Sequence, residues 1–250
     1  MMKGLLFACS LFVLACSSNA QVSDSRPISH EKWDQLLKKH VEVNGDVDYS
    51  GFKKDEALLD EYLVELSANH PNDKNWSEPE RLAYWINAYN AFTIKLVIDH
   101  YPVASIKDIK KGIQMVNSVW DIKFIEIEGQ EYDLNNIEHS ILRKEHEEPR
   151  IHFAVNCASI SCPVLLNEAY TADKLEDQLD RQTRAFLADP VRNKVAEDEL
   201  QLSKIFSWFT KDFTRDGTVQ EFVDKYSDVN VSSKARISYL DYNWGINDKG

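Results

Sequence analysis

The feature that most constrains the fold is a long apolar helix whose two ends are marked in the sequence. Residues 77–80 (SEPE) have the spacing of a capping box with a proline just inside the helix start, and Pro102 stops the helix after Tyr101. Both sides of this segment are apolar; the residues are Leu82, Ala83, Trp85, Ile86, Tyr89, Ala91, Phe92, Ile94, Leu96 and Ile98. Because a helix that is apolar all round is buried, the sequence predicts a central helix over residues 79–101.

Two amides interrupt this apolar surface. Asn87 and Asn90 are three residues apart and are therefore neighbours on the helix surface. Burying them without partners would cost about 1–3 kcal/mol for each lost hydrogen bond. Two readings stay open: the amides hold the backbone of a loop in place, or one of them orients a catalytic imidazole, as in Cys-His-Asn sites.

The rest of the chain predicts an α+β fold in which helices predominate. Residues 29–250 form a single globular domain, with a small sheet around a strand from Ile151 to Cys157. A β-hairpin is expected over 124–132, short paired strands near Val195 and 200–202, and a C-terminal strand over 236–242.

The first twenty residues are typical of a secretory leader. A short positive start precedes an apolar core that is too short to span a bilayer. Cleavage before Cys16 would give a lipoprotein, and cleavage after Ala20 would give a soluble chain, with residues 21–28 as a tether. Either route predicts the periplasm or an outer-membrane-anchored lipoprotein, with membrane contact only through a lipid on Cys16.

The charge of the chain argues against some partners. With 29 Lys and Arg against 41 Asp and Glu, the formal net charge is −12 at pH 7. Such acidity disfavours binding to nucleic acid or to anionic lipid through bulk charge. No glycine-rich phosphate loop is present, and no cofactor is expected.

Two cysteines lie in the part of the chain that is expected to fold, and they are five positions apart. Cys157 ends the apolar run IHFAVNC, and Cys162 closes the short loop that follows. Free thiols at this place would indicate a nucleophile, whereas a closed pair would indicate a structural staple in an oxidising compartment.

A thiol nucleophile needs a base within hydrogen-bond reach. In a regular strand, His152 would lie about 16 Å from Cys157 and on the opposite face, so it is a poor base. His139 is the better candidate, because a short connection joins its helix to the strand. Glu138 or one of the two helix amides could then orient its ring.

The chain resembles a known family in four separated motifs that occur in order. They are 81–91 (RLAYWINAYNA), 137–143 (IEHSILR), 152–159 with 161–163 (HFAVNCAS and SCP), and 239–244 (YLDYNW). The resemblance is to the family called domain of unknown function five-four-seven, over about residues 75–245. It implies a bacterial envelope protein without an established activity. In plant-type members the second cysteine position is often serine, which implies that Cys157 has the functional role.

These observations predict a thiol-dependent acyl-transfer enzyme for amide or peptide hydrolysis or transpeptidation. Its active centre would be Cys157 with His139, supported by Asn87, Asn90 and Glu138. A cysteine-peptidase-like or transglutaminase-like arrangement is the analogy, and the partner would be a peptide or amide substrate or an envelope protein.

Two other interpretations of the cysteines stay open. The main alternative to the enzyme is a non-catalytic envelope binding or scaffolding module with a Cys157–Cys162 disulfide. A zinc site on His139, His152 and the two cysteines is a third option, which the spacing does not favour because it lacks a compact paired-ligand signature.

Overall fold

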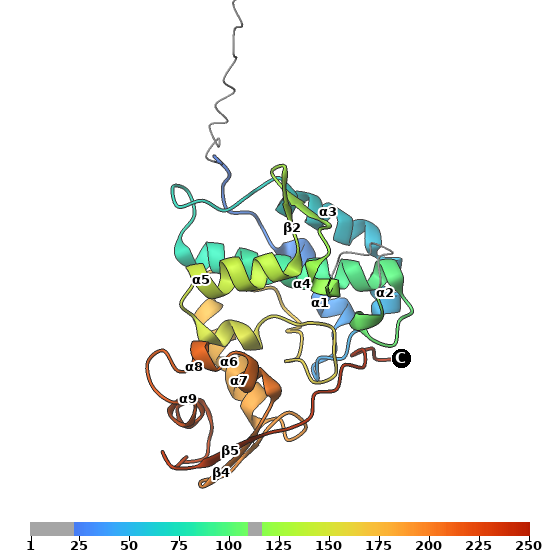
Figure 1. The fold of residues 1–250 in the computed structure, drawn as a ribbon. Helices are drawn as coiled ribbons and strands as arrows, with labels where there is room; N and C mark the ends of the chain where they lie inside the picture. The colour runs from blue at the N-terminus through green and yellow to red at the C-terminus, as the bar shows by residue number, and fades with distance from the viewer. Residues whose placement is uncertain (1–22, 110–116) are drawn as a thin grey trace, which may run out of the picture.

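The computed structural model describes residues 23–109 and 117–250 (Figure 1). The expected leader over residues 1–20, with its Cys16, lies outside the described residues. Residues 23–28, the described part of the expected tether, lie against the loop that precedes the long helix. There the Ser23 hydroxyl donates to the carbonyl of His70 at 3.1 Å, and the Trp76 indole donates to the carbonyl of Ser25 at 3.2 Å.

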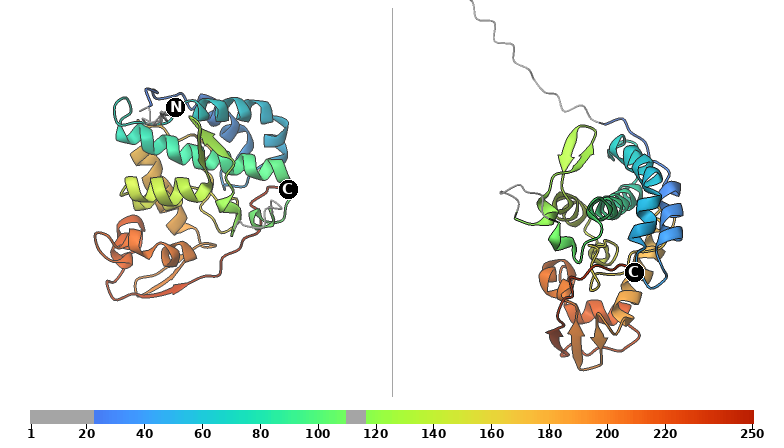
Figure 2. Two further views of the ribbon diagram at one scale, coloured as in Figure 1. Left: turned by 45° about the horizontal axis from the view of Figure 1, so that its top comes forward. Right: turned by 90° about the vertical axis from the view of Figure 1, so that its right-hand side faces the viewer.

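The central helix is α4 (Glu78–His100), and its prediction is confirmed. The capping box forms as expected, since Glu80 accepts a hydrogen bond from the backbone of Ser77 at 2.7 Å. Helices α2 (Tyr49–Lys54) and α3 (Glu56–Ser67) pack on α4, and α1 (Glu31–His40) packs on α2 and α3 (Figures 1 and 2).

The segment after α4 contains the predicted hairpin and a helix of unusual pitch. Strands β1 (Ile125–Ile127) and β2 (Gln130–Tyr132) are antiparallel, which confirms the hairpin. Two short 3₁₀ turns precede it, η1 (Ile106–Asp108) and η2 (Val119–Asp121). After it, the π-helix η3 (Asn136–Leu142) runs into α5 (Arg143–Glu145) and packs on α4. π-helical turns are rare and are frequently found at functional sites.

The predicted strand from Ile151 to Cys157 is wrong. Residues 149–153 form the 3₁₀ helix η4 (Pro149–Phe153), and residues 154–157 continue without regular structure. Ile151 through Asn156 are all buried. A continuous apolar run fits any fully buried segment, and here Pro149 opens a helical turn instead of a strand. No strand of the described residues pairs with this segment.

The C-terminal half of the structure, from residue 175 onward, contains a three-stranded sheet. Strands β3 (Lys194–Val195), β4 (Glu199–Leu202) and β5 (Arg236–Tyr239) are adjacent in that order, with β4 and β5 parallel. Four helices complete this half: α6 (Leu175–Ala188), α7 (Lys204–Trp208), α8 (Thr210–Phe213) and α9 (Val219–Tyr226). The fold is thus α+β with helices predominating, as predicted, but the sheet lies away from the cysteine segment.

The C-terminal segment returns from the sheet to the helices of the N-terminal half (Figure 2). On the way it binds the cysteine loop, because Ile160 donates to the carbonyl of Gly245 at 2.8 Å. At its end, the backbone of Val47 donates to the carbonyl of Asn247 at 2.9 Å. The segment therefore ties the two halves together across the cysteine loop.

Two clusters of buried apolar side chains underlie this arrangement. The larger is built around α4, and the smaller is an aromatic cluster between α6, α7, α8 and α9 that includes Phe153, Phe206 and Phe213. Residues 151–157 contribute to both clusters. Within residues 23–109 and 117–250, no helix has the length and apolar character needed to cross a membrane.

Candidate active site

A cavity of about 190 Å³ opens where the two halves meet. It brings together three of the predicted site residues, Cys157, His139 and Glu138, and adds His152. Its other lining residues are mostly apolar or aromatic: Tyr89, Trp120, Asn135, Val155, Cys162, Pro163, Ile205, Trp208, Phe209, Tyr242 and Trp244.

The two cysteines are free thiols in close contact. The Sγ atoms of Cys157 and Cys162 are 2.9 Å apart, and the backbone N–H of Cys157 donates to the sulfur of Cys162 at 2.9 Å. Cys157 is partly exposed, whereas Cys162 is buried. The structure therefore holds a dithiol here and no disulfide.

The loop geometry that exposes Cys157 has a local cause. Ala158 adopts a left-handed φ of 58°, which is unfavourable for a residue with a Cβ. The side chain of Asn156 compensates: its oxygen accepts from the backbone of Ala158 at 2.8 Å, and its amide donates to the carbonyl of Pro163 at 2.7 Å. The turn therefore leaves Cys157 partly exposed and reverses the chain so that Cys162 contacts it.

Hydrogen bonds make the Cys157 thiol more acidic than usual. Contact with Cys162, and then with the hydroxyls of Ser159 at 3.2 Å and Tyr242 at 3.3 Å, lowers its pKa to about 7, although burial alone would raise it. Burial raises the pKa of Cys162 well above its usual value. At pH 7 the Cys157 thiol is therefore about half ionised, whereas Cys162 is protonated.

His139 lies on η3 and lines the cavity, as predicted. Its Nδ1 accepts a hydrogen bond from Arg143 at 3.2 Å, and burial together with the charge of Arg143 lowers the pKa of the ring. The imidazole is therefore neutral at pH 7, with its proton on Nε2. Its side chain is 40% exposed, and the hydrogen bonds of the described residues do not join it to Cys157.

The reason given against His152, its place on a regular strand, does not hold, because the residue lies on the 3₁₀ helix η4. On η4 the ring lines the same cavity as Cys157. Its Nε2 donates to Asp212 at 2.8 Å, and the ring stacks on Phe209 with centroids 4.0 Å apart. Its Nδ1 is buried and has no hydrogen-bond partner within the described part of the chain. An imidazole oriented by a carboxylate with one free nitrogen is the arrangement of a general base.

Asp212 is a site residue that the sequence analysis missed. Although burial alone would raise its pKa, hydrogen bonds from His152 and Arg143 hold the pKa of this carboxyl well below its usual value. Arg143 Nε donates to Asp212 at 2.6 Å. The residue is 60 positions from His152 in the chain, and no local signal distinguishes it from other acidic residues.

Glu138 lies next to His139 on η3 and is almost fully buried. Burial raises the pKa of its carboxyl to about 7, and the negative charge of Cys157 adds to this effect. Its oxygen accepts a long hydrogen bond from the Tyr89 hydroxyl at 3.4 Å. Cys157 and Glu138 therefore titrate in the same range and disfavour each other's charged forms.

The two amides of α4 hold loops, which is the first of the two readings left open. Asn90 donates to the carbonyl of Ala154 at 3.0 Å and accepts from the backbone of Asn156 at 2.8 Å. Asn87 makes the same paired bonds with Tyr170, at 2.8 and 3.0 Å. Neither amide is hydrogen-bonded to an imidazole. Asn90 instead fixes the backbone immediately before Cys157.

Aromatic side chains form the rim of the cavity. Trp208 and Trp244 stack with centroids 5.7 Å apart, and Trp120 and Tyr242 pack on Trp244 at 5.5 and 4.5 Å. Trp208 is 47% exposed. Tyr242 and Trp244 were not predicted as site residues, although they belong to the C-terminal motif 239–244, which is the sequence signal that could have indicated them.

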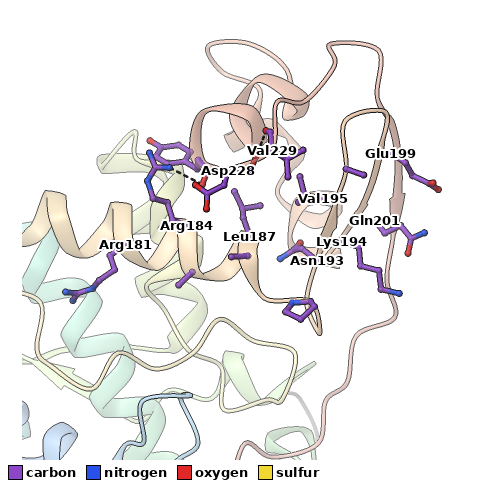
Figure 3. Close-up of a pocket in the computed structure, with 16 residues that line it drawn as sticks. Arg181, Arg184, Leu187, Asn193, Lys194, Val195, Glu199, Gln201, Asp228 and Val229 are labelled. Atoms are coloured by element: carbon purple, nitrogen blue, oxygen red, sulfur yellow. Dashed lines mark hydrogen bonds between the residues drawn. The ribbon is translucent and has the colours of Figure 1, made fainter.

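Outside this cavity, the described residues show neither a metal-binding cluster nor a second reactive site. Within the described ranges, no group of three or more His, Cys, Asp or Glu side chains could hold a metal ion. A larger groove of about 900 Å³ lies between α6, the β3–β4 hairpin and the segment after α9 (Figure 3). Leu187 and Val229 lie near its centre, with Arg181 and Lys194 at its edges. None of its described lining residues is histidine or cysteine, so it offers no thiol or imidazole chemistry.

Comparison with known proteins bears on the central part of the chain. Residues 74–187 match the family model described as "Protein of unknown function, DUF547". The match is to the family that the sequence motifs resemble. The DUF547 segment contains Cys157, His139, Glu138 and both amides, whereas Asp212 and the aromatic motif 239–244 lie beyond it.

The other comparisons add no relative. Neither a curated protein nor a solved structure matches the chain. The predicted likeness to cysteine peptidases or transglutaminases therefore stays a prediction, and the match to DUF547 names no reaction.

Proposed function

We propose that this protein is a thiol-dependent acyl-transfer enzyme that hydrolyses or transfers an amide or peptide bond. The observation that carries the proposal is the Cys157 thiol, whose pKa is lowered to about 7 at a partly exposed position in a cavity with two imidazoles. A thiolate at neutral pH is the form of cysteine that attacks carbonyl groups.

The proposed reaction uses the ionised form of Cys157 and the protonated form of Glu138. The Cys157 thiolate attacks the carbonyl carbon and forms a thioester as the amine leaves. The amine takes a proton from Glu138, whose pKa of about 7 leaves it partly protonated. Water, deprotonated by a neutral imidazole, then hydrolyses the thioester, or a second amine accepts the acyl group.

Two imidazoles compete for the role of base. His139 is the more exposed and lies beside Glu138, with 3.9 Å between Nδ1 and the nearest carboxylate oxygen. His152 is buried, but Asp212 orients its ring at 2.8 Å. Loss of a general base lowers a rate by about 10²–10⁴-fold, so His139→Asn and His152→Asn distinguish the two.

The first experiment tests the nucleophile. Reduced protein is incubated with a panel of peptide and acyl-amide substrates, and trapped thioester is detected by mass spectrometry on the peptide that carries residue 157. We expect acylation of Cys157, its loss in Cys157→Ser, and alkylation of Cys157 at pH 7 faster than that of a free model thiol. Alkylation of Cys157 no faster than that of the model thiol would overturn the proposal and favour the binding-module alternative.

We also propose that the protein works in the cell envelope, on the strength of the leader sequence over residues 1–20. Intact mass of the protein purified from its own cells gives the mature N-terminus. A diacylglyceryl group on Cys16 would indicate a lipoprotein, and a start at Gln21 would indicate a soluble periplasmic protein. A chain that retains Met1 would exclude both.

A further inference from the structure

The contact between the two sulfurs suggests a second reaction of Cys157. At 2.9 Å the Sγ atoms are already closer than unbonded sulfurs usually lie, and both thiols are free. Bond formation between them requires only a small movement of the side chains. They are also the two cysteines of the described residues, so each is the other's nearest thiol partner within residues 23–109 and 117–250.

The two sulfurs are unequal in access. Cys157 is partly exposed and lines the cavity, whereas Cys162 is only 4% exposed. A reagent that enters the cavity meets Cys157 first. This division between an accessible attacking cysteine and a buried second cysteine is what a thiol–disulfide exchange reaction needs.

The loop that joins the cysteines is held from both sides. Arg192 donates from Nε to the carbonyl of Cys162 at 2.7 Å and from Nη2 to the carbonyl of Ile160 at 2.8 Å. On the other side, the hydroxyl of Ser161 accepts from the backbone of Asn243 at 2.8 Å. The backbone is therefore fixed in a position that brings the two sulfurs together and does not depend on a bond between them.

We propose that Cys157 and Cys162 form a reversible dithiol–disulfide couple that exchanges with an external disulfide. The Cys157 thiolate attacks one sulfur of that disulfide, and the other sulfur leaves as a thiol after taking up a proton. Cys162 then loses its proton and attacks Cys157, which forms the Cys157–Cys162 bond and releases the second external thiol. The external disulfide gains two electrons, and the protein dithiol loses two.

This inference rests on the accessible Cys157 thiolate of the proposed function and adds regulation to it. Oxidation removes the nucleophile, so the oxidised protein cannot acylate. Reduction restores both thiols. The couple would thus switch acyl transfer off in an oxidising compartment and on again when a reducing partner acts.

Oxidised glutathione is the probe for the test. The reduced full-length protein is incubated with it, quenched with acid and digested with trypsin. Residues 151–174 form one tryptic peptide that carries both cysteines, so Cys9 and Cys16 do not enter the measurement. We expect this peptide to lose two hydrogens and to carry no glutathione at the end of the reaction.

Variants identify the order of attack. Cys162→Ser should stop at a mixed disulfide between glutathione and Cys157, accumulating to about one per chain. Cys157→Ser should react far more slowly than the wild type. A wild type that stops at the mixed disulfide, or that does not react, would overturn the inference, and this readout needs no variant to fold.

The two proposals can fail separately. Exchange without trapped thioester on any substrate would leave the couple intact and remove the acyl-transfer proposal. Acylation of Cys157 without formation of the internal disulfide would do the opposite.

Discussion

Two carboxylates with similarly low side-chain exposure differ in charge: Glu138 lines the cavity, whereas Asp212 binds the His152 ring. The side chain of Glu138 on η3 is 12% exposed and that of Asp212 on α8 is 11% exposed. The pKa of Glu138 is raised to about 7 by burial, whereas hydrogen bonds from His152 and Arg143 hold the pKa of Asp212 well below its usual value. Burial raises the pKa of both carboxyls, and only at Asp212 do the hydrogen-bonding partners outweigh it.

This difference separates the roles of the two regions. The Asp212 region has a cation and an imidazole as partners, so its carboxylate stays ionised and orients His152. The Glu138 region has a tyrosine hydroxyl and the Cys157 sulfur, so its carboxyl keeps a proton that it can donate. Two like groups with pKa values pushed apart are typical of acid–base sites. Four substitutions test this comparison.

The largest effect is expected at Asp212. Asp212→Asn removes the charge that pairs with Arg143 and His152, and loss of one partner of a buried ion pair costs about 4 kcal/mol. Urea unfolding at pH 7 measures it. Since the folded-state pKa of Asp212 is lowered, the stabilisation is full above about pH 4 and is lost as the pH falls further. The difference between wild type and variant should therefore shrink below pH 4.

The control for this substitution is Asp216→Asn, on an exposed residue in the same region. It should change the free energy of unfolding by less than about 0.5 kcal/mol. Equal effects at the two positions would show that the ion pair does not stabilise the Asp212 region.

The next effect is expected on the α4 side, where Asn90 holds the backbone before Cys157. Asn90→Ala leaves the buried carbonyl of Ala154 and N–H of Asn156 unpaired, which costs about 3 kcal/mol. Chemical denaturation measures the loss, and exposed Asn230→Ala is the matched control. The alkylation rate of Cys157 should change as well, and an unchanged rate in a destabilised variant would refute the positioning of the thiol by Asn90.

Glu138→Gln should remove a pH dependence of the free energy of unfolding. It should not change that free energy by the same amount at every pH. The unfolded carboxyl ionises near pH 4.5, whereas the folded one ionises near 7, so the stabilisation by the neutral form is full below about pH 4.5 and is lost as the pH rises through 7. The wild type should lose about 3 kcal/mol across this window relative to the variant.

Unfolding free energies at pH 4.5 and 7.5 for both proteins measure this slope. Exposed Glu126→Gln serves as the control, because it should leave the slope unchanged. A variant with the wild-type slope would mean that Glu138 is ionised throughout, and the proposed proton donor would then be lost.

The smallest effect is expected at Tyr242, which the C-terminal segment brings to 3.3 Å from the Cys157 sulfur. Tyr242→Phe removes one hydrogen bond to the thiolate, so the thiol pKa should rise by less than about one pH unit. The pH profile of alkylation by iodoacetamide measures it. Tyr239→Phe, at a residue of β5 that is 40% exposed, is the control, and a downward shift in Tyr242→Phe would contradict the assignment.

Local signals sufficed for part of the fold and of the site. The capping box at Ser77 and the proline at 102 predicted a helix over residues 79–101. The observed helix α4 spans residues 78–100. Cys157, His139 and Glu138 were also found in advance, because thiol, imidazole and carboxyl groups carry their chemistry in their residue type. Their presence in one cavity depended on contacts between distant segments.

The sequence by itself determined the central helix and the identity of the reactive groups, since caps, prolines and side-chain chemistry act within a few residues. Only the tertiary structure decided that residues 151–157 are not a strand, that His152 faces the cavity, and that Asp212 orients it. The reason is physical: a buried apolar run is compatible with several backbone conformations, and a hydrogen bond between residues 60 positions apart is formed by packing, which no local pattern records.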